Sequence, residues 1–191
     1  KRAVHLFAIS LCAVAMAFSV FVIACLEMFL REIAEVTDPA RYEEILVEHW
    51  RDSDRLLVSH FPRPIPENAR NVAFSFRPAF LQGGAHVQLR CSLPADVVLE
   101  LYQRFSRVKT KSFFGGYSGD HINMKEGMPT TDFHTSGSSD RKFPKDFEVM
   151  IFDKILKKED RPDEFYWNHG RSHGVAISKQ RNEIVYWAEH W

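Results

Sequence analysis

A long apolar stretch opens the chain. From Ala3 to Leu26 no side chain carries a charge, and His5 is the only ionisable group there apart from two thiols. As a helix, these 24 residues would extend about 36 Å, which exceeds the ~30 Å hydrocarbon core of a bilayer. We therefore predict a transmembrane helix over residues 1–30.

The flanking charges predict how this helix is oriented. Lys1 and Arg2 precede it, whereas Glu27, Arg31 and Glu32 follow it. Basic residues at one end of a spanning helix favour the cytoplasmic side for that end. We expect a single-pass protein with its N-terminus in the cytoplasm, the rest of the chain outside the cytoplasm and the lipid bilayer as its first partner.

Cys25 supports a second interpretation of the anchor. The residues before it, Val22, Ile23 and Ala24, loosely resemble the box that precedes the lipidated cysteine of a lipoprotein. A lipidated cysteine is normally followed by a small polar tether, but here apolar residues continue at helical spacing. A third interpretation, a cleaved secretory signal, would have a shorter apolar core of about 7–15 residues. The spanning helix is therefore favoured over lipidation and cleavage.

One face of the apolar helix carries small residues, which are Ala8, Cys12, Ala15 and Ser19. Small residues at this spacing let two helices approach closely in lipid. This face is a candidate contact with a second copy of the chain or with another membrane protein. The alternative is that alanine is simply frequent in this stretch.

Residues 31–60 are expected to form a juxtamembrane helix. Thr37 is a suitable N-cap and Pro39 fits the first turn. The residues that would share one face of this helix are Ile45, Leu46, His49 and Trp50. Three prolines then follow within residues 61–70, where they favour an extended Pro-rich linker.

Beyond the linker, the hydrophobic pattern changes to that of strands. Residues 71–80 and 85–93 each alternate between apolar and polar side chains, and a turn with Gly83 and Gly84 separates them, which predicts a hairpin. Cys91 falls on the apolar side and is expected in the core. Residues 94–108 are typical of a helix, and its predicted inner stripe comprises Val97, Val98, Leu101, Phe105 and Val108.

The C-terminal part of the chain predicts more strands. Residues 109–146 show no periodicity, so they are disordered, form a functional loop or contain short strands. Residues 147–156 are typical of a buried strand, and residues 174–191 of a hairpin that turns at 179–182. The predicted fold class is α+β: a transmembrane helix, then an extracytoplasmic domain over residues 71–191 with a small antiparallel sheet, two hairpins plus a strand, packed on one helix.

Composition excludes some classes of function. The chain is 45% apolar and 26% charged with a formal net charge of zero, which is typical of a globular protein. Because it lacks the excess of basic residues that attracts polyanions, we expect no nucleic-acid partner.

Four residues within 109–146 combine carboxylate and imidazole side chains, namely Asp120, His121, Asp132 and His134. Such groups can converge on a metal ion, although their spacing matches no zinc motif. His169 and His173 are less suited to chelation because Gly170 argues against a helix between them. A triad of Ser, His and carboxylate can form in space without a sequence signature. Since no motif points to such a triad or to a bound cofactor, the sequence predicts no catalytic residue and no cofactor.

These patterns favour a membrane-anchored extracytoplasmic domain with a binding, accessory or scaffold role. The alternative is a membrane-anchored hydrolase or metal-dependent enzyme whose site lies in the 109–146 loop. A second alternative concerns the anchor alone, which would be a lipid on Cys25.

Overall fold

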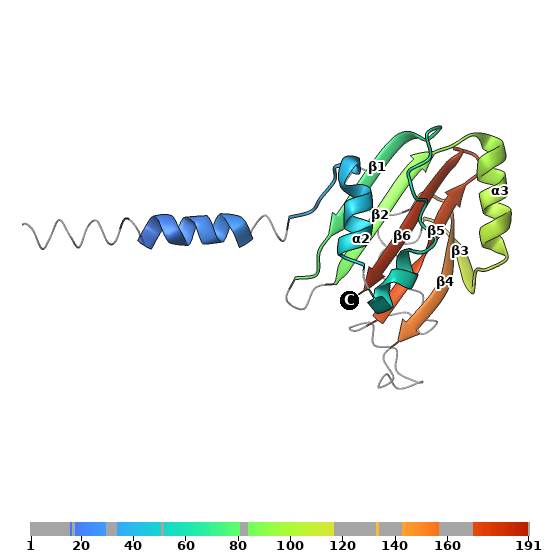
Figure 1. Cartoon of the computed structure of the whole chain (residues 1–191). Coiled ribbons are helices and arrows are strands. Elements are labelled where there is room, and N and C mark those ends of the chain that lie inside the picture. Colours follow the sequence, from blue (N-terminus) through green and yellow to red (C-terminus); the bar gives the residue numbers. More distant parts are fainter. Residues whose placement is uncertain are drawn as a thin grey trace, which may run out of the picture. The chain divides into compact units, whose positions relative to one another are not determined.

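The structure is a computed structural model that describes residues 16, 18–29, 34–50, 52–80, 84–116, 133, 143–156 and 170–190 (Figure 1). Contacts within the chain divide it into two compact units, Lys1–Ala34 and Glu35–Trp191. We refer to them as the N-terminal unit and the folded unit.

In the N-terminal unit, residues 18–29 are helical. Nine large apolar side chains are between 43% and 67% exposed, and they are Met16, Phe18, Val20, Phe21, Val22, Ile23, Leu26, Met28 and Phe29. Within the described part of the chain, no helix combines the length and the apolar character that crossing a membrane requires. Of the transmembrane helix predicted over residues 1–30, the described part is residue 16 and residues 18–29.

The described residues of the folded unit contain one six-stranded antiparallel sheet with the order β1-β2-β6-β5-β4-β3. The strands are β1 Arg70–Arg77, β2 Ala85–Ser92, β3 Lys111–Phe114, β4 Glu148–Leu156, β5 Gly170–Ser178 and β6 Glu183–His190. The helical elements are η1 Pro39–Arg41, α2 Tyr42–Glu48, η2 Asp52–Val58 and α3 Ala95–Ser106. The fold is therefore α+β, as predicted.

Both predicted hairpins are present. In the first, β1 pairs with β2 so that Phe74 lies opposite Leu89. In the second, β5 pairs with β6, and Ser178 lies opposite Glu183 across the predicted turn. The pairing of β2 with β6 joins the two hairpins into one sheet.

One face of the sheet carries the larger core. Helices α2 and α3 and the 3-10 helix η2 all pack against it (Figure 1). The core members from these helical elements are Tyr42, Ile45, Leu46, Leu57, Val58, Val98 and Phe105. From the strands the same core receives Phe74, Phe76, Ala85, Val87, Leu89, Cys91, Met150, Val175, Ile177, Ile184, Tyr186 and Ala188.

This core differs from the predicted organisation in two ways. Residues 35–60, predicted as part of a juxtamembrane helix, belong to the folded unit together with the sheet. Phe61, in the predicted linker, is 4% exposed and lies in the same core. The physical reason is that one helix is too narrow to cover a six-stranded sheet, so α2 and η2 cover the part that α3 leaves.

The opposite face of the sheet carries a smaller core. Its members are Phe133, Phe143, Phe147, Val149, Ile151, Ala176, Val185 and Trp187. Gly174 lies opposite Trp187, and a Cβ at Gly174 would meet the carbonyl oxygen of Met150 and approach Cζ2 of Trp187 to 3.1 Å. The missing side chain therefore leaves room for the indole.

The aperiodic stretch 109–146 contains the short strand β3, which pairs with β4, so the alternative of short strands holds for Lys111–Phe114. One further expectation needs correction. Val108, predicted on the inner stripe of the helix, is 57% exposed because α3 ends at Ser106 and the chain turns away from the core. The other members of that stripe are buried or partly buried in the larger core, and they are Val97, Val98, Leu101 and Phe105.

Candidate functional site

The residues singled out as a candidate metal site lie outside the described residues. They are Asp120, His121, Asp132 and His134. Among the residues that the structure does describe, no group of three or more His, Cys, Asp or Glu side chains could hold a metal ion. His169 also lies outside the described residues, and His173 is part of β5.

Of the small-residue face, Ser19 lies in the described helix, whereas Ala8, Cys12 and Ala15 fall outside the described residues. Cys25 is half-buried and has a free thiol. Cys91 is buried in the larger core, as predicted, and burial raises the pKa of its thiol to about 12. The Cys91 thiol is therefore protonated at neutral pH and unreactive.

A serine, a histidine and a carboxylate do meet at the outer edge of the sheet. The hydroxyl of Ser75 on β1 donates to Oε1 of Glu35 at 2.6 Å and lies 3.2 Å from Nε2 of His86 on β2. Ser75 is 1% exposed and His86 is 6% exposed. Arg77 lies 3.8 Å from the other oxygen of Glu35.

The order of these contacts differs from that of a catalytic triad. In a triad the serine gives its proton to the imidazole, and the carboxylate binds the opposite ring nitrogen. Here the single hydroxyl proton of Ser75 goes to Glu35, so Nε2–H of His86 donates to Ser75. The arrangement suits a structural role: it fixes Glu35 to the sheet, beside the two backbone hydrogen bonds of Val36 with Phe76 at 2.8 and 2.9 Å.

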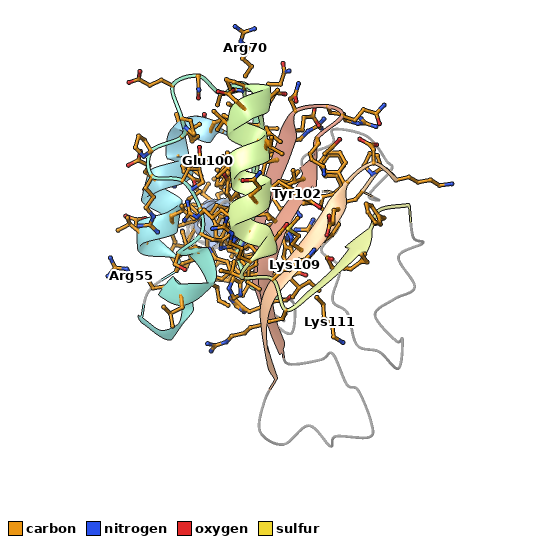
Figure 2. All side chains as sticks on the ribbon, turned by 90° about the vertical axis from the view of Figure 1, so that its right-hand side faces the viewer. Arg55, Arg70, Glu100, Tyr102, Lys109 and Lys111 are labelled. Atoms are coloured by element: carbon orange, nitrogen blue, oxygen red, sulfur yellow. The ribbon has the colours of Figure 1, made fainter. Side chains whose placement is uncertain are left out.

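A second polar cluster lies between α3 and β4. Oε1 of Glu148 accepts a hydrogen bond from Nζ of Lys109 at 2.6 Å, and Oε2 accepts one from the hydroxyl of Tyr102 at 2.7 Å. Nζ of Lys179 lies 3.9 Å from the centroid of the Tyr102 ring. Figure 2 shows Tyr102 on α3 and Lys109 beyond the end of that helix.

Hydrogen bonds keep Glu148 ionised. Burial raises the pKa of this carboxyl group, but hydrogen bonds from Lys109, Tyr102 and Ser112 outweigh burial, and the pKa is lowered overall. Because its partners already satisfy the carboxylate, this cluster is better suited to holding the end of α3 on the sheet than to proton transfer.

His60 forms a third candidate site on the same face of the sheet as α2. Its ring centroid lies 5.4 Å from that of His173 and 5.2 Å from that of Phe152. Nε2 of His60 donates to the carbonyl oxygen of Gly174 at 2.8 Å. Burial, and then the neighbouring His173, lower the pKa of His60 to about 3, so the ring is neutral at physiological pH.

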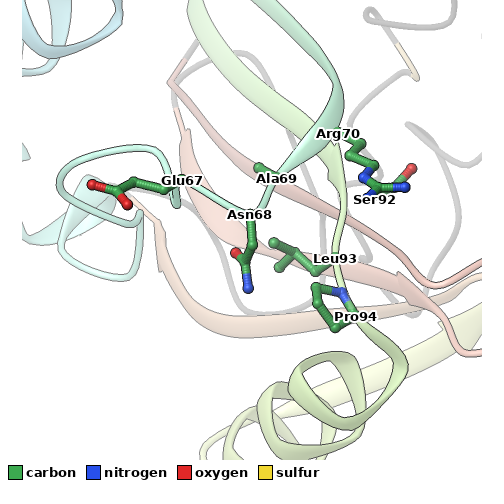
Figure 3. Close-up of a pocket in the computed structure, with 7 residues that line it drawn as sticks. All are labelled: Glu67, Asn68, Ala69, Arg70, Ser92, Leu93 and Pro94. Carbon is green, nitrogen blue, oxygen red and sulfur yellow. The ribbon is translucent and has the colours of Figure 1, made fainter.

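A pocket of about 430 Å³ opens where β1 begins and β2 leads into α3 (Figure 3). The residues that line it are Glu67, Asn68, Ala69, Arg70, Ser92, Leu93 and Pro94. Figure 3 shows Glu67 and Arg70 on opposite sides of Leu93. The pocket therefore combines a small apolar floor with one acidic and one basic side chain, and its size falls within the range of small-molecule sites.

Neither this pocket nor the three polar clusters around Ser75, Glu148 and His60 was predicted from the sequence. Glu35 and Ser75, for example, are separated by 40 residues, and Lys109 and Glu148 by 39. Only strand pairing brings such residues together. The predicted hairpin makes Ser75 and His86 neighbours on one face of the sheet, but no pattern in the sequence predicts that Glu35 lies beside them.

Comparison of the chain with protein-family models, with curated proteins and with solved structures found no match.

Proposed function

We propose that this chain holds a small folded domain at a membrane and acts there by binding, as an accessory or scaffold subunit. The N-terminal helix supplies the attachment and the folded unit supplies the binding surface. This proposal places the folded unit outside the cytoplasm, because Lys1 and Arg2 precede the apolar stretch.

One observation carries the proposal, namely the exposure of the apolar helix. Its nine large apolar side chains are at least 43% exposed. A helix that is apolar all round is stable only when lipid or protein surrounds it. Val20, Phe21 and Val22 lie on different sides of such a helix, since successive residues are about 100° apart, and all three are exposed. Lipid can surround all of these sides, which supports attachment to a bilayer.

The binding role is supported by how the polar clusters are arranged. Glu148 already accepts hydrogen bonds from Lys109 and Tyr102, and Ser75 donates to Glu35 rather than to His86. By contrast, Glu67 and Arg70 at the pocket are exposed and available to a ligand. We take this pocket as the candidate contact for a partner.

Extraction of native membranes tests the attachment. The full chain should stay in the membrane pellet after a wash with alkaline carbonate, which releases peripheral proteins. Release of the whole chain into the supernatant would contradict the proposal. The intact mass of the protein then separates the two kinds of anchor: an unprocessed chain supports the helix, and a product that begins at a lipid-modified Cys25 supports the lipoprotein alternative.

Capture from native membranes in mild detergent tests the binding role. We expect a partner that the tagged full chain retains and that the charge-swapped pocket variant, Glu67→Lys with Arg70→Glu, loses. A matched control, Glu43→Lys with Arg55→Glu, swaps two exposed charges elsewhere and should retain the partner. If residues 1–34 alone capture the same proteins as the full chain, the folded unit has no binding role.

A further inference from the structure

The C-terminal end of α3 continues into a strongly basic turn, residues 104–111, which we call the basic turn. It contains Arg104, Arg107, Lys109 and Lys111, and the sequence has no acidic residue between Glu100 and Asp120. Figure 2 shows Lys109 and Lys111 together beyond the end of α3.

Backbone hydrogen bonds hold the basic turn in a compact shape. The amide of Arg107 donates to the carbonyl oxygen of Arg104 at 3.3 Å, and the amides of Val108 and Lys109 donate to that of Phe105 at 3.1 and 3.0 Å. The next amide, that of Thr110, donates to Ile151 on β4 at 2.7 Å. These bonds fix the backbone from Arg104 to Thr110, and with it the exposed Arg104, Arg107 and Val108 at the end of α3. Lys111 pairs with Ile151, a member of the smaller core, and so belongs to the other face of the sheet.

The basic turn also contains an exposed apolar side chain. Val108 is 57% exposed and lies between Arg107 and Lys109. Glu148 neutralises Lys109 at 2.6 Å, but Arg104 and Arg107 are exposed, and the guanidinium of Arg104 lies 5.3 Å from the Phe105 ring. Exposed apolar and cationic side chains at one place match the interface of an anionic membrane, where charge attracts and the apolar group inserts.

Helix α2 provides a natural contrast within the same unit. Val47 is 58% exposed, nearly the same fraction as Val108, but the exposed charged residues on α2 are acidic: Glu43, Glu44 and Glu48. Arg41 neutralises Glu44 at 2.6 Å, which leaves Glu43 and Glu48. The folded unit therefore presents two exposed valines in opposite electrostatic surroundings. An anionic lipid surface would attract the basic turn and repel α2.

We infer that the basic turn docks on anionic phospholipid headgroups, with Val108 inserted among them, so that the folded unit rests on the bilayer by this edge. This inference rests on the proposed membrane attachment, because the attachment keeps the folded unit near the bilayer. Two exposed arginines and one apolar side chain are too few for stable binding without a second signal.

Site-directed spin labelling of the full chain tests this docking. Replacing Cys12 and Cys25 with Ser leaves Cys91, which is 0% exposed and therefore does not react with the label. A nitroxide is then placed at Val108→Cys or, as the matched control, at Val47→Cys. Each protein is reconstituted in vesicles of phosphatidylcholine alone or of phosphatidylcholine mixed with phosphatidylglycerol. Accessibility to oxygen and to a water-soluble nickel chelate is then measured.

We expect the label at position 108 to gain oxygen accessibility and lose nickel accessibility in the anionic vesicles only, whereas the label at position 47 stays aqueous in both. Replacing Arg104 and Arg107 with Gln should return the label at position 108 to water. Raising the salt from about 0.15 M to about 1 M should do the same, since the Debye length falls from about 8 Å to about 3 Å.

Failure of this inference is distinguishable from failure of the proposed function. If the chain floats with both kinds of vesicle while position 108 stays aqueous in both, docking of the basic turn is overturned and the attachment stands. If the chain floats with neither kind of vesicle, the proposed attachment itself is overturned.

Discussion

At the scale of single residues, His60 shows how a buried polar group can tie a loop to a sheet. It lies just after η2 and donates to Gly174, a residue of β5 that is 114 positions away. Burial favours the neutral form of the His60 ring, and so does His173, since protonation would place an imidazolium beside it. This cost depends on pH.

We predict that acid weakens the fold partly through His60. The folded-state pKa of about 3 lies below the ordinary value of 6.5, so protonation favours the unfolded chain as pH falls from about 6.5 toward about 3. The contribution of this group is fully present above pH 6.5. Between pH 6.5 and about 3, protonation of His60 in the unfolded chain should lower the free energy of unfolding by up to ~1.4 kcal/mol for each pH unit that the pH falls.

Denaturant unfolding across this pH range measures the effect. His60→Gln keeps a donor for Gly174 but does not titrate, so its stability should change less with pH than that of the wild type. His49→Gln, at an exposed position, serves as the control and should keep the wild-type slope. An unchanged slope in His60→Gln would rule out His60 as a source of acid sensitivity.

Gly174 is the second residue whose identity the structure explains. We predict that Gly174→Ala lowers the free energy of unfolding by about 1–3 kcal/mol, because the added methyl group meets the Met150 carbonyl and crowds Trp187. Gly116→Ala is the comparison. There the φ of 89° costs about 1 kcal/mol and the methyl group meets only a flexible lysine side chain. Thermal or denaturant unfolding of both variants checks that Gly174→Ala loses more unfolding free energy than Gly116→Ala. An equal or larger loss in Gly116→Ala would contradict this prediction.

At the scale of elements, local patterns predicted those strands and helices that have their own periodicity. The β1–β2 hairpin and α3 belong to this group, because their apolar residues recur every second position in the strands and at helical spacing in the helix. The β5–β6 hairpin was predicted as well, although most residues of both strands are buried. Strand β3 has only four residues, Lys111–Phe114, and two adjacent phenylalanines, so no alternation marks it.

The candidate sites were less predictable than the elements. The pocket is built from the turn before β1 and the turn before α3, and only the antiparallel pairing of β1 with β2 places these two turns together. Periodicity also placed Val108 in the core, whereas the structure exposes it beyond the end of α3. A local rule that fails in this way often marks a functional position.

The Glu148 cluster gives a prediction about α3. Glu148→Gln should lower the free energy of unfolding by about 1.5–3 kcal/mol at pH 7, because it leaves Lys109 without its charged acceptor. The lowered pKa means that the wild-type contribution is present above pH 4.5 and is lost as pH falls through the folded-state value. Glu100→Gln, exposed on the same helix, should change stability by no more than about 0.5 kcal/mol. Equal losses in the two variants would contradict a role of Glu148 in holding α3.

At the scale of the whole molecule, an apolar helix precedes a folded unit that has its own core. The large apolar side chains differ sharply between the two units. Those of the helix are exposed, whereas Tyr42, Leu89 and Trp187 in the folded unit are at most 1% exposed. The folded unit thus buries most of its large apolar residues in its own cores, which the exposed residues of the helix do not share.

Vesicle flotation of matched variants tests this central claim most directly. Phe21→Asp with Ile23→Asp places two charges in the helix, and Val47→Asp with Leu56→Asp places two charges at exposed apolar positions of the folded unit. We predict that the wild type and the second variant float with phosphatidylcholine vesicles, whereas the first variant stays in the aqueous fraction. Flotation of the first variant to the same extent as the wild type, or a wild-type chain that stays in the aqueous fraction, would contradict the account.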